Sequence, residues 1–192
     1  MAFGVRSALV LTAFLAGCSD QPATPTAEQG EVVAAQEELS IDPDATGFGK
    51  AIVFQGVGSC FPAPVFNAEL KALLSRFDEG ADIEPRRPTA HSSYLGKAVA
   101  VTEGYLLSVT APVEGKWLGL RLASIQHWAA PETDYIGFSL GFSATKAEVI
   151  KAVNGIGFGV LATGDLMIEG EVESYIRVLE DTNGKAFLQC GS

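Results

Sequence analysis

Basic residues are scarce in this chain of 192 residues, which has 13 Lys and Arg against 23 Asp and Glu. The formal net charge at pH 7 is −10. Because like charges repel, a chain this acidic argues against nucleic acid and anionic lipid headgroups as partners. We therefore expect no nucleic-acid partner.

Histidine is also scarce, with only His91 and His127 in the whole chain. Neither has a second His or a carboxylate at the spacing that metal ligands use, so no metal site is predicted. The glycine-rich run 155–159 lacks the spacing of the dinucleotide motif and follows a predicted helix, so we interpret it as a turn. The sequence predicts neither a metal nor a cofactor.

One pattern matches a catalytic motif. Residues 137–141 read GxSxG, the nucleophile elbow of α/β hydrolases. That motif requires a His after the Ser in chain order, whereas both histidines precede Ser139. Ser139 also alternates with Phe138 and Leu140, which predicts an outward-facing strand residue. We expect no catalytic residue and no enzymatic activity, and a hydrolase that uses Ser139 is the remote alternative.

No hydrophobic run is long enough to span a bilayer as a helix. The longest near the N-terminus, residues 8–16, follows Arg6 and indicates a signal peptide. It ends in Leu15-Ala16-Gly17-Cys18, which resembles the lipobox of bacterial lipoproteins. The resemblance implies cleavage before Cys18 and a diacylglycerol on its thiol. With Ser19 at the next position, it implies the periplasmic face of the outer membrane in preference to the inner membrane.

Cysteine is rare, and Cys60 and Cys190 are the only others. Disulfides form and persist in exported proteins, so we predict that these two pair. The bond would tie the last residues of the domain to its beginning and stabilise it. The alternative, a pair of reactive or metal-binding thiols, lacks a CxxC spacing and a nearby His.

Composition divides the chain into three parts. Residues 1–17 form the predicted lipoprotein signal peptide. Residues 18–46 are rich in Pro, Ala, Glu, Asp and Thr, which predicts an acylated Cys18 followed by a flexible acidic tether. Residues 47–192 form one predicted globular domain, long enough to bury a single core.

Hydrophobic periodicity predicts an α+β domain. Apolar residues at helical spacing predict a helix over residues 66–77, and a capping box at Thr145 and Glu148 predicts a second helix that ends near Gly155. Residues 79–95 are interpreted as a loop. The predicted fold is a mostly antiparallel sheet with two helices packed on it and one disulfide. The predicted strands cover residues 51–54, 98–102, 105–110, 118–122, 136–140, 172–179 and 185–190.

The run 136–155 resembles the signature of small outer-membrane lipoproteins of the barrel-assembly accessory type. It departs from that signature by insertions before Thr145 and before Gly155. The resemblance implies an α+β fold, and it transfers no binding residues. The matching positions are Gly141, Thr145, Glu148, Val149 and Gly155.

Two functions remain open at this point. Trp117 and Trp128 belong either to the core or to an exposed sheet face, where they would be anchors for a partner. The leading hypothesis is a non-enzymatic, membrane-anchored envelope lipoprotein that binds another envelope component through an exposed sheet face or helix. The second is a module that holds a small ligand or inhibits an enzyme, which requires an apolar pocket or a protruding loop.

Overall fold

The computed structural model describes residues 39–56, 58–75, 89–130, 136–168 and 174–191, all within the compact unit Gln36–Ser192. The described helices are α1 (Pro64–Ser75), α2 (Lys146–Asn154) and the short 3-10 helices η1 (Phe48–Ala51) and η2 (Ser92–Tyr94). None of them is long and apolar enough to cross a membrane. The strands are β1 (Leu39–Ser40), β2 (Thr46–Gly47), β3 (Phe54–Gln55), β4 (Val99–Glu103), β5 (Leu106–Pro112), β6 (Gly115–Trp117), β7 (Leu120–Ala129), β8 (Ile136–Phe142), β9 (Asp165–Ile168), β10 (Ser174–Glu180) and β11 (Ala186–Gly191).

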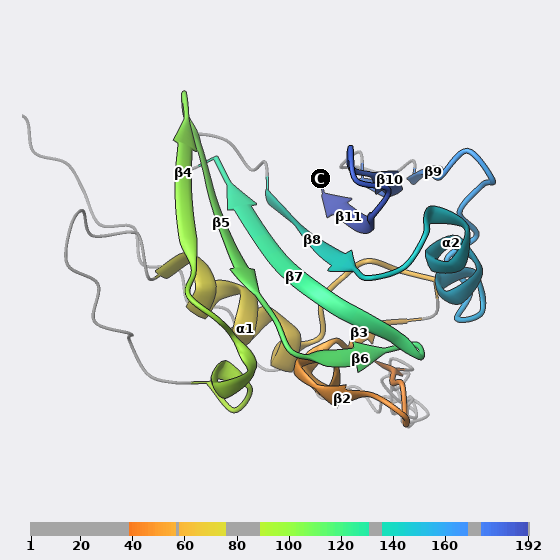
Figure 1. The fold of residues 1–192 in the computed structure, drawn as a ribbon, viewed down its shortest axis with the longest axis horizontal. Coiled ribbons are helices and arrows are strands. Elements are labelled where there is room, and N and C mark those ends of the chain that lie inside the picture. The colour runs from red at the N-terminus through yellow and green to blue at the C-terminus, as the bar shows by residue number, and fades with distance from the viewer. Residues whose placement is uncertain (1–38, 57, 76–88, 131–135, 169–173, 192) are drawn as a thin grey trace, which may run out of the picture. The chain divides into compact units, whose positions relative to one another are not determined.

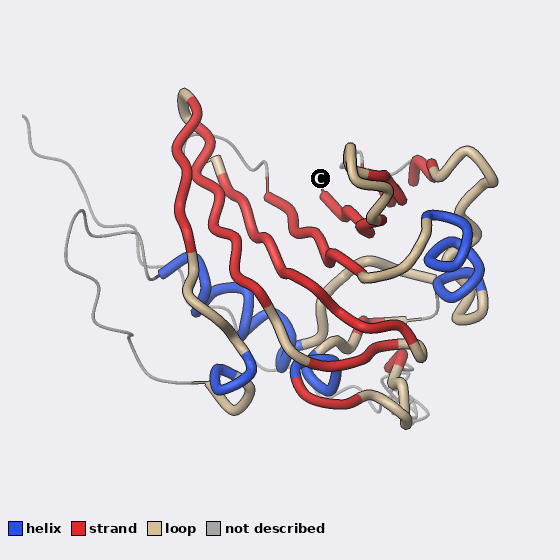
Figure 2. Tube along the Cα trace, in the orientation of Figure 1, coloured by secondary structure: helices blue, strands red, loops and turns tan. Residues whose placement is uncertain are grey.

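One antiparallel sheet of nine strands dominates the fold (Figures 1 and 2). Its order is β2-β6-β7-β8-β11-β10-β9, and the β4–β5 hairpin joins it through β7. One edge of β7 pairs first with β6 and then with β5, while the other edge pairs with β8. A register shift between Leu122 and Ser124 falls where β7 changes partner, and such a bulge bends a strand. The remaining strands, β1 and β3, pair with each other.

Alternation along the strands gives the sheet two different faces. Phe138 and Leu140 of β8 belong to the hydrophobic core, which also contains Leu70 of α1 and Val149 of α2. Ser139, between the two core residues of β8, points to the other face. The core cluster therefore contains buried residues from both helices and from one face of the sheet.

Phe54 lies at the centre of this core and is fully buried. Its ring centroid lies 5.7 Å from that of Phe66, 5.8 Å from that of Trp117, 6.0 Å from that of Phe138 and 5.5 Å from that of Phe158. Three of these four contacts are edge-to-face, an arrangement that aromatic quadrupoles favour. Phe54 thus joins a strand near the start of the domain to α1 and to the sheet.

The structure confirms the predicted α+β class, the mostly antiparallel sheet, the two α-helices and the disulfide between Cys60 and Cys190. The capping box is present as well. The Thr145 hydroxyl accepts the Glu148 backbone N–H at 3.4 Å, and the Glu148 carboxylate accepts the Thr145 N–H at 2.8 Å. These bonds satisfy donors that the first turn of α2 leaves free.

The domain begins before residue 47, which corrects the predicted end of the tether. Residues 39–46 contribute β1 and the first residue of β2, and Ala45 is buried. The Asp42 carboxylate accepts the Leu118 backbone N–H at 2.6 Å. This segment joins the fold through backbone pairing and one carboxylate, which a polar segment can provide. Its polar composition therefore did not distinguish it from the predicted tether. Residues 18–38 of the predicted tether lie outside the described residues.

Two predicted strands are wrong in detail. Leu118 and Gly119 have φ of 51° and 74° and form the two-residue turn between β6 and β7, so β7 begins only at Leu120. The apolar run 51–54 contains the end of η1 and only the first residue of β3. All of that run is buried, and continuous burial does not distinguish a strand from an irregular segment.

Candidate functional site

A cavity of about 320 Å³ lies at the end of the sheet where β8 begins and β11 ends. In Figure 1 this is the end of β8 that lies near the C-terminus of the chain. The wall combines the end of β3 and the loop after it with one side of α1 and the ends of four further strands, and it is largely apolar. The residues that line it include Cys60, Leu70, His127, Gly137, Ser174 and Cys190. We call this space the His127 cavity.

The disulfide forms part of the cavity wall. Cys60, in the loop before α1, and Cys190, in β11, have Cα atoms 5.9 Å apart and both line the cavity. The bond therefore fixes the position of the loop against the last strand. A pairing predicted only as a stabilising tie also shapes a candidate binding site.

His127 is the only buried polar side chain among the described residues that line the cavity. It lies on β7 and is 3% exposed, and its Nδ1 is 2.8 Å from the Leu70 carbonyl oxygen of α1. A carbonyl oxygen can only accept a hydrogen bond, so Nδ1 carries the proton and Nε2 presents a lone pair. Nε2 has no hydrogen-bond partner in the described part of the chain.

Burial also fixes the charge of this imidazole. Loss of solvation lowers the pKa of His127 below its ordinary value of 6.5, although the hydrogen bond to Leu70 acts in the opposite direction. His127 is therefore neutral at neutral pH. The wall of the cavity consequently contains one buried imidazole whose tautomer and charge are both set by the protein.

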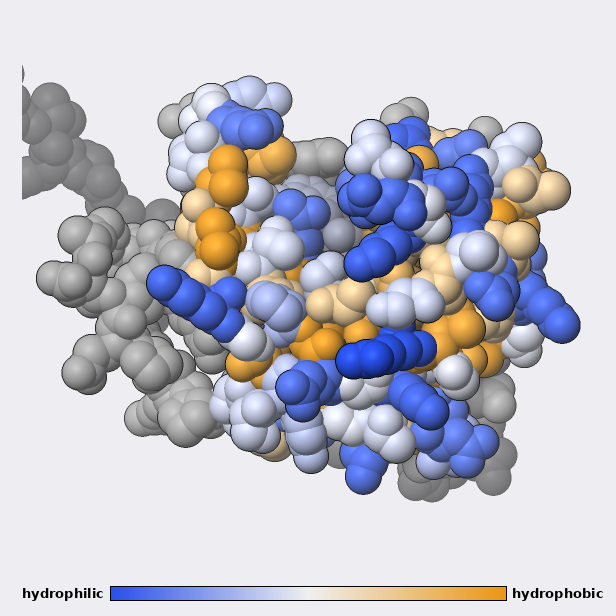
Figure 3. Space-filling model, viewed as in Figure 1, coloured by the Kyte–Doolittle hydropathy of each residue, from blue (hydrophilic) through white to orange (hydrophobic). Residues whose placement is uncertain are grey.

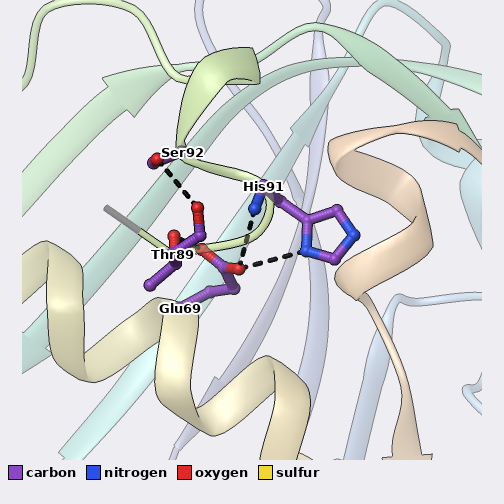
Figure 4. A network of polar contacts seen from close by, with 4 residues as sticks. All are labelled: Glu69, Thr89, His91 and Ser92. Atoms are coloured by element: carbon purple, nitrogen blue, oxygen red, sulfur yellow. Dashed lines mark hydrogen bonds and ion pairs between the residues drawn. The ribbon is translucent and has the colours of Figure 1, made fainter. Parts of the chain in front are cut away.

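A separate polar cluster joins Glu69 of α1 to the turn 89–92 (Figure 4). The Glu69 carboxylate is 3% exposed and accepts hydrogen bonds from the Thr89 hydroxyl and, at 3.2 Å, from the His91 backbone N–H. His91 Nδ1 is 3.1 Å from the same carboxylate. The Ser92 hydroxyl donates to the Thr89 carbonyl at 2.9 Å and closes the turn.

This cluster serves the fold, since three donors satisfy a buried carboxylate and attach the turn 89–92 to α1. Across the described residues, no hydroxyl or thiol is hydrogen-bonded to the outer ring nitrogen of His91, so a nucleophile paired with this dyad is not seen. Likewise, no group of three or more His, Cys, Asp or Glu that could hold a metal ion occurs among them.

The fold does not place Ser139 next to a histidine. In the register between β7 and β8, Ser139 lies opposite Gln126, and His127 lies opposite Phe138. Neighbouring positions point to opposite faces, so Ser139 and His127 lie on different sides of the sheet. The Ser139 hydroxyl is 3.4 Å from Gln126 Oε1, and the residue is only 7% exposed, less than expected for an outward strand position.

Close packing against neighbouring residues explains the presence of both glycines in the GxSxG run. A side chain at Gly137 would meet the Trp128 ring and the Cys190 carbonyl, and one at Gly141 would meet the Ser124 hydroxyl. Glycine allows these neighbours to lie flat against β8. The pattern therefore arises from sheet packing, and it does not form an elbow, since Ser139 continues a regular strand.

The exposed-anchor interpretation of Trp117 and Trp128 is wrong. Trp117 is 1% exposed and packs in the core, with its ring centroid 6.4 Å from that of Phe142. Trp128 is 4% exposed and lies over Gly137 on the other face of the sheet. The indole N–H of Trp128 is buried with no partner among the described residues. Neither side chain is available to a partner protein.

Exposed apolar side chains occur instead on the β4 edge. Val99 and Val101 are 58% and 47% exposed, and Tyr105, in the turn after β4, is 67% exposed. Figure 3 shows hydrophobic residues along this strand. Thr110 and Ser108, which lie opposite the two valines on β5, separate them from the middle of the sheet face. The exposed apolar surface at this edge is therefore narrow.

Sequence reasoning did not find the His127 cavity. The cavity is formed by residues that are distant in the sequence. His127 and Leu70 are 57 residues apart, and the two cysteines of the disulfide are 130 residues apart, so no local sequence pattern connects them. Comparison of the chain with protein-family models, with curated proteins and with solved structures found no match. Its function is therefore inferred from its own residues.

Proposed function

We propose that this chain is a lipid-anchored protein of the bacterial cell envelope whose domain binds a small, largely apolar molecule in the His127 cavity. The observation that carries the proposal is a largely apolar cavity whose wall contains one buried imidazole, His127, with its tautomer fixed by the Leu70 carbonyl. Cavities of a few hundred Å³ with few, fixed polar groups are typical of small-molecule sites. A domain held by a tether to a membrane would sample such molecules close to the lipid surface.

The membrane anchor is tested by acylation. Cells supplied with radioactive palmitate are expected to label the wild-type protein and leave Cys18→Ala unlabelled, because the lipobox resemblance places the acylated thiol at Cys18. Ser19→Ala, which keeps the thiol, is the matched control and should label normally. A wild-type chain that takes up no palmitate would exclude lipid anchoring.

Binding is tested with a probe and a cavity-filling variant. The mature chain, exported with an ordinary signal peptide and carrying Cys18→Ser, is titrated with 1-naphthol in a calorimeter. A cavity of about 150 Å³ already admits benzene, so about 320 Å³ leaves room for two fused rings. Ser174 lines the cavity and is half-buried, so Ser174→Phe should fill part of it and weaken binding at least about tenfold.

Ser108→Phe makes the same change at a half-buried strand serine that does not line the cavity. It should leave the affinity unchanged. Absence of binding to the wild type, or equal binding by Ser174→Phe and the wild type, would show that the cavity is not a ligand site.

Binding of another envelope protein is the second candidate function. It is favoured by β4, an edge strand with exposed Val99 and Val101 to which a partner strand could pair. It is the weaker proposal because the aromatic side chains expected to anchor such a partner are buried. It requires no cavity, so the Ser174→Phe result separates the two candidates.

A further inference from the structure

One side chain in the wall of the His127 cavity, the imidazole of His127, has a fixed hydrogen-bonding role. His127 Nδ1 is occupied by the Leu70 carbonyl, so the ring offers only the lone pair of Nε2. The other polar residues of the wall, such as Gln55 and Asn67, are partly exposed and have amide groups that both donate and accept. They can adapt to a ligand, whereas the buried imidazole can only accept.

The cavity also lacks charge. None of the described residues that line it is Lys, Arg, Asp or Glu. An anion placed there would lose its hydration and gain no opposite charge in return. A carboxylate would in addition place its lone pairs against that of Nε2. Ordinary fatty-acid anions are therefore poor candidates for this site.

We infer that the molecule bound in the His127 cavity is a neutral, apolar alcohol, phenol or amide whose O–H or N–H donates a hydrogen bond to His127 Nε2. The inference rests on the proposed function and adds the chemical class of the ligand. It also assigns His127 as the residue that determines specificity. The reason is energetic: a bound ligand excludes water from Nε2, and a ligand without a donor then leaves this acceptor unsatisfied, which costs more than a neutral exchange of hydrogen bonds.

The test uses four probes that share one ring system. Naphthalene has no polar group, 1-methoxynaphthalene can only accept, 1-naphthol can donate, and 1-naphthoate is an anion. Calorimetry at pH 7.5 on the mature Cys18→Ser chain is expected to give 1-naphthol about three- to tenfold higher affinity than 1-methoxynaphthalene. The 1-naphthoate ion should bind most weakly of the four.

His127→Phe removes the acceptor and keeps a ring of similar size. In this variant 1-naphthol and 1-methoxynaphthalene should bind equally, while naphthalene should bind no more weakly than it binds the wild type. A preference for 1-naphthol that survives in His127→Phe would overturn the assignment of His127. A general loss of folding would not produce this pattern, since it would remove binding of all four probes.

A second measurement needs no variant at His127. With only two histidines in the chain, ¹⁵N-histidine labelling gives a simple spectrum in which His91 is the internal reference. The unprotonated Nε2 of His127 should shift upfield when 1-naphthol binds and stay in place when naphthalene binds. An unmoved Nε2 resonance under saturating 1-naphthol would overturn the inference even if His127→Phe does not fold.

The outcomes separate the two proposals. If none of the four probes binds, ligand binding in the cavity fails, and the inference about ligand class fails with it. If the three neutral probes bind with equal affinity, the cavity is a ligand site and only the role of His127 is wrong. If 1-naphthoate binds best, the requirement for a neutral ligand is wrong.

Discussion

Replacing both members of the disulfide, as Cys60→Ala with Cys190→Ala, is expected to lower the free energy of unfolding by about 5 kcal/mol. The two cysteines are 130 residues apart, and closing a loop of that length removes much of the entropy of the unfolded chain. For a domain of this size, the melting temperature should fall by about 10–20 °C. Denaturant unfolding followed by circular dichroism measures the change.

The same variant should bind 1-naphthol more weakly, because both cysteines line the His127 cavity. Cys18→Ser, which changes the one cysteine outside the disulfide, is the control and should unfold like the wild type. Reducing agent added to the wild type should reproduce the effect of the double variant. A denaturation midpoint that does not respond to the reductant would contradict the stabilising role of the bond.

Phe54→Ala is expected to lower the free energy of unfolding by about 3–5 kcal/mol. Phe54 is fully buried and contacts four other aromatic rings, so truncation leaves a cavity at the centre of the core. The rings of Phe66, Trp117 and Phe138 belong to α1 and to the sheet and cannot all move inward. Urea unfolding with a constant m-value would show that stability alone has changed.

Phe61→Ala is a matched control from the same part of the chain. Phe61 is 58% exposed, and truncation of an exposed side chain changes stability by no more than about 0.5 kcal/mol. The two variants remove the same group and differ only in burial. Similar losses for both would mean that Phe54 does not organise the core.

The elements that sequence patterns predicted are those with local signals. In both α-helices the apolar residues recur at the helical period, and a window of about a dozen residues is enough to recognise this pattern. The Thr145–Glu148 capping box lies within one turn of α2. The disulfide followed from the number of cysteines in a chain interpreted as exported. These predictions required no knowledge of how strands pair.

The candidate site could not be predicted because it depends on pairing between distant segments. His127 lies beside α1 only because β7 places it on the core face of the sheet, and the same alternation sends Ser139 to the opposite face. Trp128 gave a misleading signal for a related reason: its burial requires Gly137 on the neighbouring strand. Such cross-strand relations are a property of the register, which the sequence patterns did not reveal.

The way the chain enters the domain has a mechanical consequence. If the protein is anchored at Cys18, a pull away from the membrane acts first on β1 and β2, which are held by two residue pairs each, and on the Asp42–Leu118 hydrogen bond. These contacts can be peeled off at low force. Peeling stops where Phe48 and Phe54 enter the core, and beyond them the covalent bond from Cys60 to Cys190 passes the load to the last strand of the sheet. The entry segment can thus lengthen the anchor under tension while the core stays folded.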